Sequence, residues 1–139
     1  MKSFSVHLTF GGNCEEAINF YKNCFGGEIL AKSTYGESPM PTSDDFKSKI
    51  MHIEFKFDNV LVMAADGMPG FSPNISNNIA LTIDFTDARE EETVFNKLAN
   101  GGKVTMPLQD TFWNAKFGMI TDKYGISWML NYSKPKLDE

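Results

Sequence analysis

The chain has 139 residues, of which 42% are hydrophobic and 22% are charged, and its formal net charge is -5 at pH 7. These values are typical of one globular domain, and no apolar run approaches the roughly 20 residues of a membrane span. The acidic balance argues against a nucleic-acid partner, because a phosphate backbone is bound by clustered Lys and Arg. We therefore expect no membrane partner and no nucleic-acid partner.

The first half of the chain predicts a strand, a helix and three further strands. Residues 4–10 alternate apolar and polar side chains, as a half-buried strand does. Asn13 is predicted to cap a helix over residues 14–25. A loop is expected over 36–46 and a tight turn at Asp58-Asn59, with strands at 28–35, 51–57 and 60–65.

The second half predicts the same order of elements after a linker over residues 67–76. A strand is expected at 78–85 and a helix that begins at Asp87, followed by strands at 103–109, 113–121 and 126–132. The stretch Ser5–Phe10 recurs in altered form as Asn78–Ile83, which indicates an internal repeat. We predict one domain, 1–139, made of two β-α-β-β-β modules over about 1–66 and 77–134.

The two cysteines indicate a reducing compartment. Cys14 and Cys24 fall in the same predicted helix, about 15 Å apart, which is too far for a disulfide. Since the N-terminus shows no signal-peptide pattern, we expect a cytoplasmic protein. Cys14 has two interpretations, a reactive thiol at a helix N-terminus or a small apolar residue in the core.

Several motifs resemble the vicinal oxygen chelate superfamily, which contains glyoxalases, bleomycin-resistance proteins, fosfomycin-resistance enzymes and extradiol dioxygenases. The general motifs are Asn13-Cys14-Glu15-Glu16-Ala17, Phe20-Tyr21, Phe25-Gly26-Gly27 and Asp122-Lys123-Tyr124-Gly125-Ile126. The motifs similar to the PhnB-like branch are Met106-Pro107-Leu108-Gln109-Asp110-Thr111-Phe112-Trp113, Lys116-Phe117-Gly118 and Trp128-Met129. The resemblance implies an α+β fold in which the two modules form a curved mixed sheet around a cleft, with the helices outside.

The resemblance also implies where a metal ion would bind. Members that need a divalent ion hold it with one side chain from the first strand and one from the last strand of each module. The first-strand positions fall on Ser5 and Asn78. The last-strand positions fall within one residue of Met63 and on Met129. Because none of the four is a histidine or a carboxylate, we expect no metal and no cofactor at this inherited site.

A displaced metal site is the alternative. Strand alternation places His7 on one side of the first strand, and His52 and Glu54 together on one side of a neighbouring strand. Two histidines and a carboxylate are the ligand class of non-haem iron or catalytic zinc, so this set would suit a lyase or a dioxygenase. The other interpretation is a polar, hydrogen-bonded cavity lining in which His52 contacts the ligand or acts as a general base.

The predicted ligand site gathers the polar faces of the strands and one aromatic residue. Trp113 is a candidate for stacking on a ligand, although such tryptophans more often pack within a sheet. The predicted ligand-binding residues are Ser5, His7, Thr9, His52, Glu54, Asn78, Thr82, Trp113 and Met129. The opposite faces predict a core that includes Phe4, Val6, Leu8, Met51, Ile53 and Phe55.

Two further aspartates and the overall function complete the sequence-based predictions. Asp66 and Asp122 are interpreted as turn residues at corresponding places in the two modules rather than as catalytic acids. The leading hypothesis is a homodimeric protein that binds a small organic ligand without a metal. Another hypothesis is an assembly or regulatory protein that acts only through its dimer surface. Some PhnB-like proteins have carried the name demethylubiquinone methyltransferase. The sequence does not support this activity, because it has no Gly-x-Gly turn between a strand and a helix to hold an adenosyl methyl donor.

Overall fold

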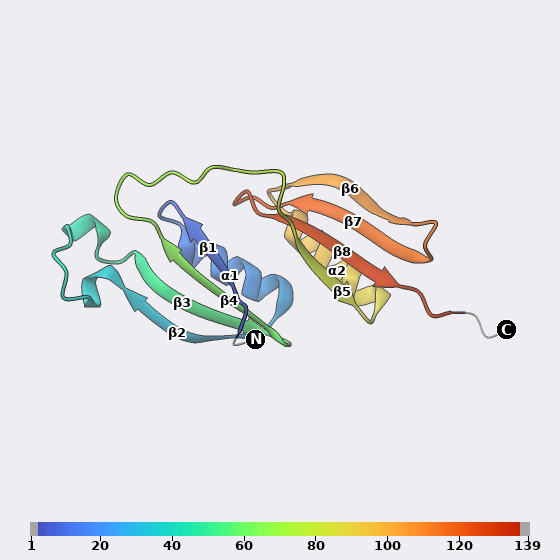
Figure 1. The fold of residues 1–139 in the computed structure, drawn as a ribbon, viewed down its shortest axis with the longest axis horizontal. Helices are drawn as coiled ribbons and strands as arrows, with labels where there is room; N and C mark the ends of the chain where they lie inside the picture. Colours follow the sequence, from blue (N-terminus) through green and yellow to red (C-terminus); the bar gives the residue numbers. More distant parts are fainter. Residues whose placement is uncertain (1–2, 137–139) are drawn as a thin grey trace. The chain divides into compact units, whose positions relative to one another are not determined.

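The structure, a computed structural model, describes residues 3–136 (Figure 1). The chain divides into two compact units, Met1–Asn74 and Ile75–Glu139. Each unit contains one long helix and one four-stranded sheet. Within residues 3–136, neither helix is long and apolar enough to cross a membrane.

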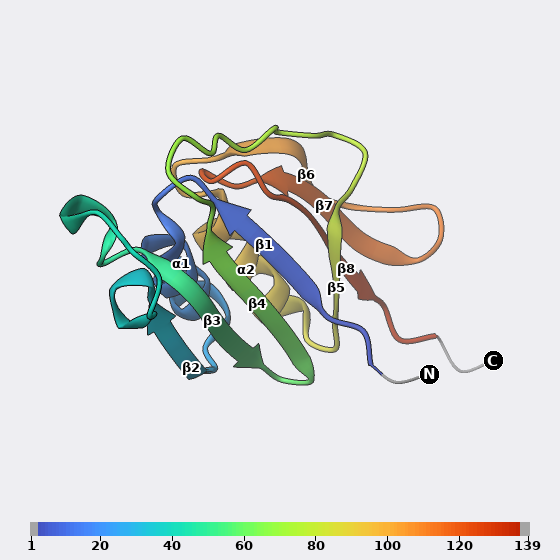
Figure 2. The ribbon, with the colours of Figure 1, turned by 60° about the vertical axis from the view of Figure 1, so that its left-hand side comes forward.

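The first unit is a β-α-β-β-β module with two short 3-10 turns inserted, η1 (Tyr35–Glu37) and η2 (Asp44–Phe46). The sheet order is β1-β4-β3-β2, and only the pairing of β1 with β4 is parallel (Figure 2). Its elements are β1 (Val6–Phe10), α1 (Cys14–Phe25), β2 (Glu28–Thr34), β3 (Ile50–Phe57) and β4 (Val60–Asp66).

The second unit repeats this topology. The sheet order is β5-β8-β7-β6, and again only the first pairing is parallel. The predicted α+β fold of two β-α-β-β-β modules is therefore confirmed, with one mixed sheet in each module. The elements are β5 (Leu81–Phe85), α2 (Ala88–Ala99), β6 (Lys103–Asp110), β7 (Ala115–Thr121) and β8 (Ser127–Ser133).

The structure shifts the repeat by two residues from the sequence prediction. Strands β1 and β5 have the same burial pattern, and each lies parallel to the last strand of its module. His7 is paired with Met63, and Thr82 is paired with Met129. Thr82 therefore corresponds to His7, whereas the sequence prediction placed Ala80 there. A shift of two residues keeps every side chain on its face, so alternation alone does not detect it.

The core of the first unit lies between α1 and the sheet. The helix buries Cys14, Ala17, Ile18, Tyr21 and Cys24. Ile53 and Phe55 are buried as predicted, at 0% and 1% exposure, but Phe4 and Met51 are 89% and 36% exposed. Phe4 precedes the first residue of β1.

Met51 is excluded from the core by a local irregularity of the strand pairing. Ser33 pairs with His52 and the next residue, Thr34, pairs with Ile50, so Met51 is the extra residue of a β-bulge. Ile50 is buried on one side of this bulge and Ile53 on the other. Strict alternation is lost there, and this is why the prediction for Met51 was wrong.

A buried carboxylate joins four segments of the first unit. Asp66, 2% exposed at the end of β4, accepts bonds through Oδ1 from the backbone N–H groups of Gly12 and Cys14, both at 2.9 Å. Its Oδ2 accepts from the N–H of Ile50, also at 2.9 Å. The side chain of Asn13 makes no capping hydrogen bond. Asp66, distant in sequence, therefore caps α1 in place of the predicted residue.

Asp122 performs a different structural role in the second unit. Its Oδ1 accepts from the N–H groups of Tyr124 and Ile126 at 2.8 and 3.1 Å, and its Oδ2 accepts from Trp128 Nε1 at 2.9 Å. Asp122 follows β7, the counterpart of β3, whereas Asp66 ends β4. The two aspartates are thus not at corresponding positions, although Asp122 does lie in the predicted turn.

Replacement of Asp66 should destabilise the first unit strongly. In Asp66→Asn an amide N–H₂ replaces one acceptor, which leaves a buried backbone donor without its partner. We expect a loss of about 3 kcal/mol in the free energy of unfolding, measured by urea denaturation followed by circular dichroism. Asp58→Asn is the matched control, because exposed Asp58 has φ of 50°, a conformation that Asn tolerates. Equal stability of the two variants would contradict the capping role.

Glu91 is a buried acid on the inner side of α2. Its side chain is 0% exposed, and within the described residues neither carboxyl oxygen has a hydrogen-bond partner. Burial raises the pKa of Glu91 to about 7, and the positive charge of Lys116 opposes that rise. The carboxyl group therefore holds its proton in the folded state over a pH range in which the unfolded chain has lost it.

This raised pKa predicts a loss of stability as pH increases. Below pH 4.5, the reference pKa, Glu91 is protonated in both states and carries no penalty. Between about pH 4.5 and pH 7 the unfolded state alone loses its proton, so stability falls, and above pH 7 the penalty is constant. Glu91→Met should therefore gain about 3 kcal/mol over wild type between pH 4 and pH 8. Exposed Glu92→Met should show no such pH-dependent gain in parallel urea titrations.

Candidate functional site

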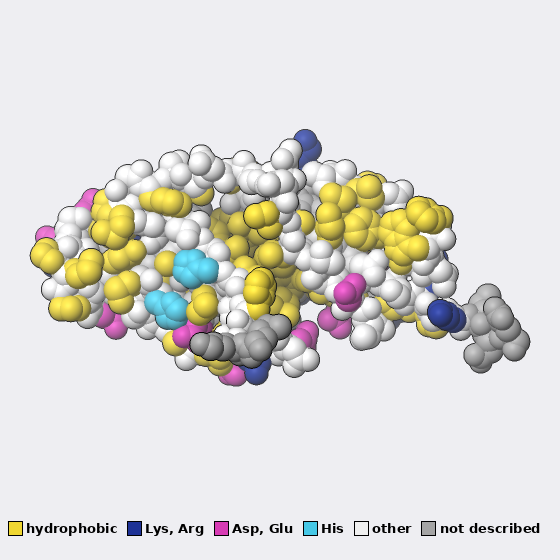
Figure 3. Space-filling view, viewed as in Figure 1, with side chains coloured by type: hydrophobic (Ala, Val, Ile, Leu, Met, Phe, Trp, Pro, Cys, Tyr) yellow, Lys and Arg dark blue, Asp and Glu magenta, His cyan; other side chains and the backbone are white. Residues whose placement is uncertain are grey.

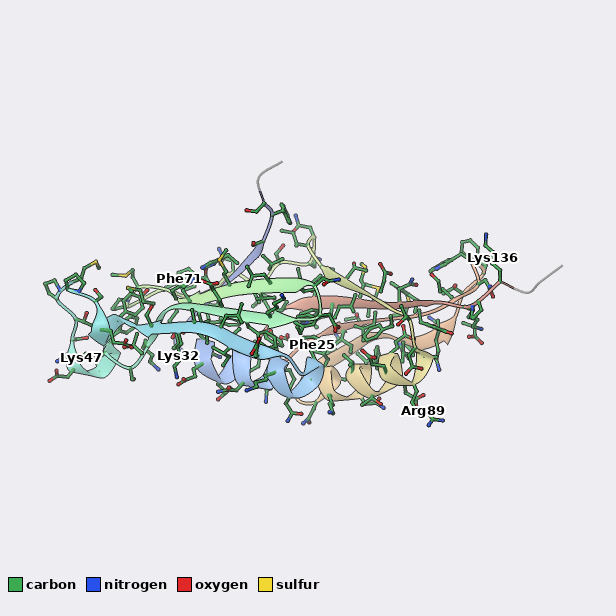
Figure 4. All side chains as sticks on the ribbon, turned by 90° about the horizontal axis from the view of Figure 1, so that it is seen from below. Phe25, Lys32, Lys47, Phe71, Arg89 and Lys136 are labelled. Atoms are coloured by element: carbon green, nitrogen blue, oxygen red, sulfur yellow. The ribbon has the colours of Figure 1, made fainter. Side chains whose placement is uncertain are left out.

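The face of the first sheet opposite α1 carries most of the predicted polar residues. Side chains on the helix face include Ile53 and Lys32, whose Nζ lies 2.7 Å from Glu15 Oε2 on α1. Alternation places the neighbouring positions on the other face, and Figure 4 shows the helix on one side of the sheet only. Cross-strand pairing sets four residues in one row on this helix-free face: His7, Met63, Glu54 and Ala31.

His52 and Glu54 form a close pair on this helix-free face. His52 Nε2 lies 2.8 Å from Glu54 Oε2, and the side chains are 40% and 33% exposed. When Glu54 accepts the Nε2 proton, Nδ1 of His52 is the ring nitrogen left with a lone pair for a ligand. His7 lies on the same side of the unit, as the two cyan patches in Figure 3 show, and its Nδ1 is 3.4 Å from Thr9 Oγ1.

The helix-free face of the second sheet carries one row rich in methionine and one mainly polar row. Pairing sets Thr82, Met129, Met119 and Met106 in one row across its four strands. The next row contains Asp84, Asn131, Phe117 and Gln109. The sequence prediction named only Thr82 and Met129 here. Of the others, Phe117, Met119 and Asn131 alternate with buried residues along β7 and β8, and that pattern was available in the sequence.

The two tryptophans have different roles. Trp113 was predicted to begin a strand, but it lies in the loop between β6 and β7, two residues before β7, and is 52% exposed. Its ring centroid lies 4.9 Å from that of Phe112 and 5.9 Å from that of Phe117, edge to face in both cases. Trp128 is 3% exposed and belongs to the core. Trp113 is thus the tryptophan that a ligand can reach.

Two predicted polar residues, like Trp113, lie outside the strands. Ser5 precedes β1, and Asn78 precedes β5 and pairs with the hydroxyl of Ser76. The residues of β1 and β5 that stand beside Met63 and Met129 are His7 and Thr82. Ser5 and Asn78 therefore lie nearer the N-terminus than the residues paired with Met63 and Met129.

The structure brings together two residues of the proposed metal trio. His52 and Glu54 are in contact, but His7 does not complete a set with them. Between residues 3 and 136, no three His, Cys, Asp or Glu side chains are grouped in a way that suits a metal ion. At the last-strand positions, the thioethers of Met63 and Met129 are soft ligands that suit hard divalent ions poorly.

The turn before α1 does not offer a phosphate cradle. A cavity of about 260 Å³ lies beside it, lined by Gly12, Asn13, Glu15, Glu16, Ser48, Lys49, Ile50 and Asp66. The N–H groups of Gly12 and Cys14, which would face a phosphate at a helix N-terminus, already bind Asp66. The carboxylates of Asp66, Glu15 and Glu16 also give this cavity an acidic wall.

Cys14 is not a reactive thiol. The residue is 0% exposed, and burial raises the pKa of its thiol to about 12, with smaller contributions from Asp66 and Glu15. Because the thiolate is the nucleophile, a thiol with this pKa is inert near neutral pH. Of the two interpretations from the sequence, the small core residue is the correct one.

Comparison with known proteins identifies the family. A family model described as 3-demethylubiquinone-9 3-methyltransferase matches residues 2–131. The chain is 34% identical over 140 residues to Protein YjdN of Escherichia coli K12, covering 94% of this chain and 95% of that protein. It is also 37% identical to PA1353 of Pseudomonas aeruginosa, whose crystal structure matches with a TM-score of 0.83 over 96% of this chain and 100% of that chain.

Other solved structures extend the likeness. A Bacillus cereus PhnB protein, described as a putative 3-demethylubiquinone-9 3-methyltransferase, is 31% identical with a TM-score of 0.78, over 94% and 99% of the two chains. More distant structures share the fold alone. They are a glyoxylase/bleomycin resistance protein/dioxygenase domain from Frankia (11% identity, TM-score 0.69, 96% and 98% covered) and FosX from Listeria monocytogenes with Mn(II) and sulfate (12%, 0.66, 96% and 94%).

The family match, the repeated module and the likeness to glyoxalase-type structures agree with one another. This chain belongs to the family described as 3-demethylubiquinone-9 3-methyltransferase and is PhnB-like.

Proposed function

We propose that this protein binds a small organic molecule on the helix-free faces of its sheets and needs no divalent ion to do so. The observation that carries the proposal is the contact of 2.8 Å between His52 and Glu54 on a face that no helix of its unit covers. A histidine held by a carboxylate offers one defined acceptor to a ligand.

The proposal treats the methyltransferase description of the family as a name only. Methyl donors with an adenosyl group are usually held by a glycine-rich turn between a strand and a helix. In this chain the turn between β1 and α1 has glycines, but its N–H groups at Gly12 and Cys14 bind Asp66. The acidic lining beside it also disfavours an anionic ligand.

The metal-dependent alternative, a lyase or dioxygenase, would use His7, His52 and Glu54. It needs His7 to reach the ion that His52 and Glu54 hold. We therefore expect purified protein to contain less than about one tenth of an equivalent of zinc, nickel, manganese or iron by elemental analysis. Near one equivalent of any of these, lost in His52→Ala, would replace the binding-protein proposal with the enzyme.

His52 should serve the ligand and not the fold. His52→Ala should lower the free energy of unfolding by about 1 kcal/mol or less, because the side chain is 40% exposed and leaves no packing void. Ile53→Ala, one residue away and fully buried, should cost about 2 to 5 kcal/mol.

The same His52→Ala variant should lose ligands. A library of small phenols, amides and organic acids, screened by saturation-transfer NMR, should yield binders of wild type that His52→Ala and Glu54→Gln no longer hold. Exposed Met40→Ala is the control and should keep them. Binders that all persist in His52→Ala, or a fold as damaged as that of Ile53→Ala, would contradict the proposed site.

We also propose that the protein acts in the cytoplasm as a homodimer. Cys14 and Cys24 are both buried in one helix, α1, too far apart along it to bridge each other, as suits a reducing compartment. Each sheet ends in edge strands that a partner can cover. Sedimentation at micromolar concentration tests the dimer, and a stable folded monomer would exclude it.

A further inference from the structure

We propose that the helix-free face of the second sheet binds a planar aromatic group that carries a hydroxyl or amine donor. This inference rests on the proposed function, since it names the class of small molecule that the protein takes. The surface concerned, called here the methionine strip, consists of Met106, Met119 and Met129. Its neighbours in the next row are Asp84, Asn131 and Phe117.

The three thioethers form a continuous strip. Met106 pairs with Met119 across β6 and β7, and Met119 pairs with Met129 across β7 and β8. Strands lie about 4.8 Å apart, so the strip is about 10 Å long, which is enough for two fused rings. Methionine sulfur contacts aromatic rings favourably, and its flexible side chain adapts to a flat surface. All three side chains are half-buried, so they remain accessible from this face.

The opposite face of the same sheet is closed to ligands. Gly118 and Leu130, one position along from Met119 and Met129, face α2 and are buried. A Cβ at Gly118 would lie 2.6 Å from the Phe95 ring, so helix and sheet are already in contact there. A ligand that binds this sheet must therefore lie on the face that carries the methionine strip.

Aromatic side chains adjoin the strip. Phe117 lies two residues before Met119 in β7, so the two side chains share a face of the sheet. The ring of Trp113 meets Phe117 edge to face at 5.9 Å and is 52% exposed. The thioethers and the two rings together form an apolar surface, so the transfer of a flat apolar molecule from water to this surface is favourable.

The polar pair in the second row sets the ligand's substituent. Asn131 Nδ2 donates to Asp84 Oδ1 at 3.2 Å, so Asn131 holds one oxygen of the carboxylate. A carboxylate accepts hydrogen bonds and repels anions, which favours a hydroxyl or amine donor and disfavours a carboxylate on the ligand. Lys116, next to Phe117 in β7, interacts with Glu91 of α2 on the other side of the sheet.

The experiment uses the full chain with ¹³C-labelled methionine methyl groups. Titration with 1-naphthol should move the methyl resonances of Met106, Met119 and Met129 by ring-current shifts. The methyls of Met40 and Met68, which are 53% and 56% exposed in the first unit, are internal controls and should not move. Resonances are assigned by single Met→Leu variants. 1-Methoxynaphthalene has the same rings without the donor and should bind about tenfold more weakly.

Variants separate the parts of the subsite. Asp84→Ala should reduce the affinity for 1-naphthol about tenfold and leave that for 1-methoxynaphthalene unchanged, whereas exposed Glu90→Ala should change neither. Met119→Gln, checked for folding by circular dichroism, should abolish the shifts at Met106 and Met129, and Met68→Gln should not.

Four results would overturn this subsite. They are the absence of shifts at millimolar 1-naphthol, equal shifts at Met40 and Met68, equal affinity for the two probes, and unchanged binding in a folded Met119→Gln. A shift confined to Met63 on the first sheet would likewise exclude the methionine strip. That last result would leave the proposed function standing. Binders that all persist in His52→Ala would instead remove the proposed site at His52 and leave the methionine strip untouched.

Discussion

The carboxylate of Asp66 is the constraint on which the first module depends. It reaches the turn after β1, the first residue of α1 and the first residue of β3 from the end of β4. Three buried N–H groups that no regular ladder satisfies are thereby bonded to one side chain. The same contacts fix α1 against one face of the sheet, so the other face, with His52 and Glu54, is left without a helix. The proposed ligand residues His52 and Glu54 therefore lie on a face that α1 does not cover.

The two modules have the same topology but different chemistry on equivalent rows. His7, Met63, Glu54 and Ala31 cross the first sheet where Thr82, Met129, Met119 and Met106 cross the second. Only the methionine of the last strand is common to both rows. The row of the first module therefore offers hydrogen-bonding groups, and the row of the second module offers mainly apolar contact.

The sequence predicted the order of the elements because each one has a local signal. Alternation marked β1 and β3, helical spacing marked α1, and Asp58-Asn59 marked the turn before β4. Features that depend on distant residues were not predicted. The cap of α1 comes from Asp66, 52 residues after Cys14, and the β-bulge at Met51 depends on how β2 pairs with β3. No local pattern carries either contact.

The candidate site was predicted in the same uneven way. The faces of His7, Thr9, His52 and Glu54 followed from parity alone, and parity survives any even shift in register. The identity of cross-strand neighbours does not survive it. The residues paired with Met63 and Met129 are His7 and Thr82, which lie two residues after Ser5 and four residues after Asn78. A site inherited from the superfamily depends on which residues are neighbours across strands. The pairing of Met63 with His7 and of Met129 with Thr82 identifies these neighbours more directly than sequence position does. This pairing places a thioether beside an imidazole in one module and beside a hydroxyl in the other, a donor set that suits organic ligands.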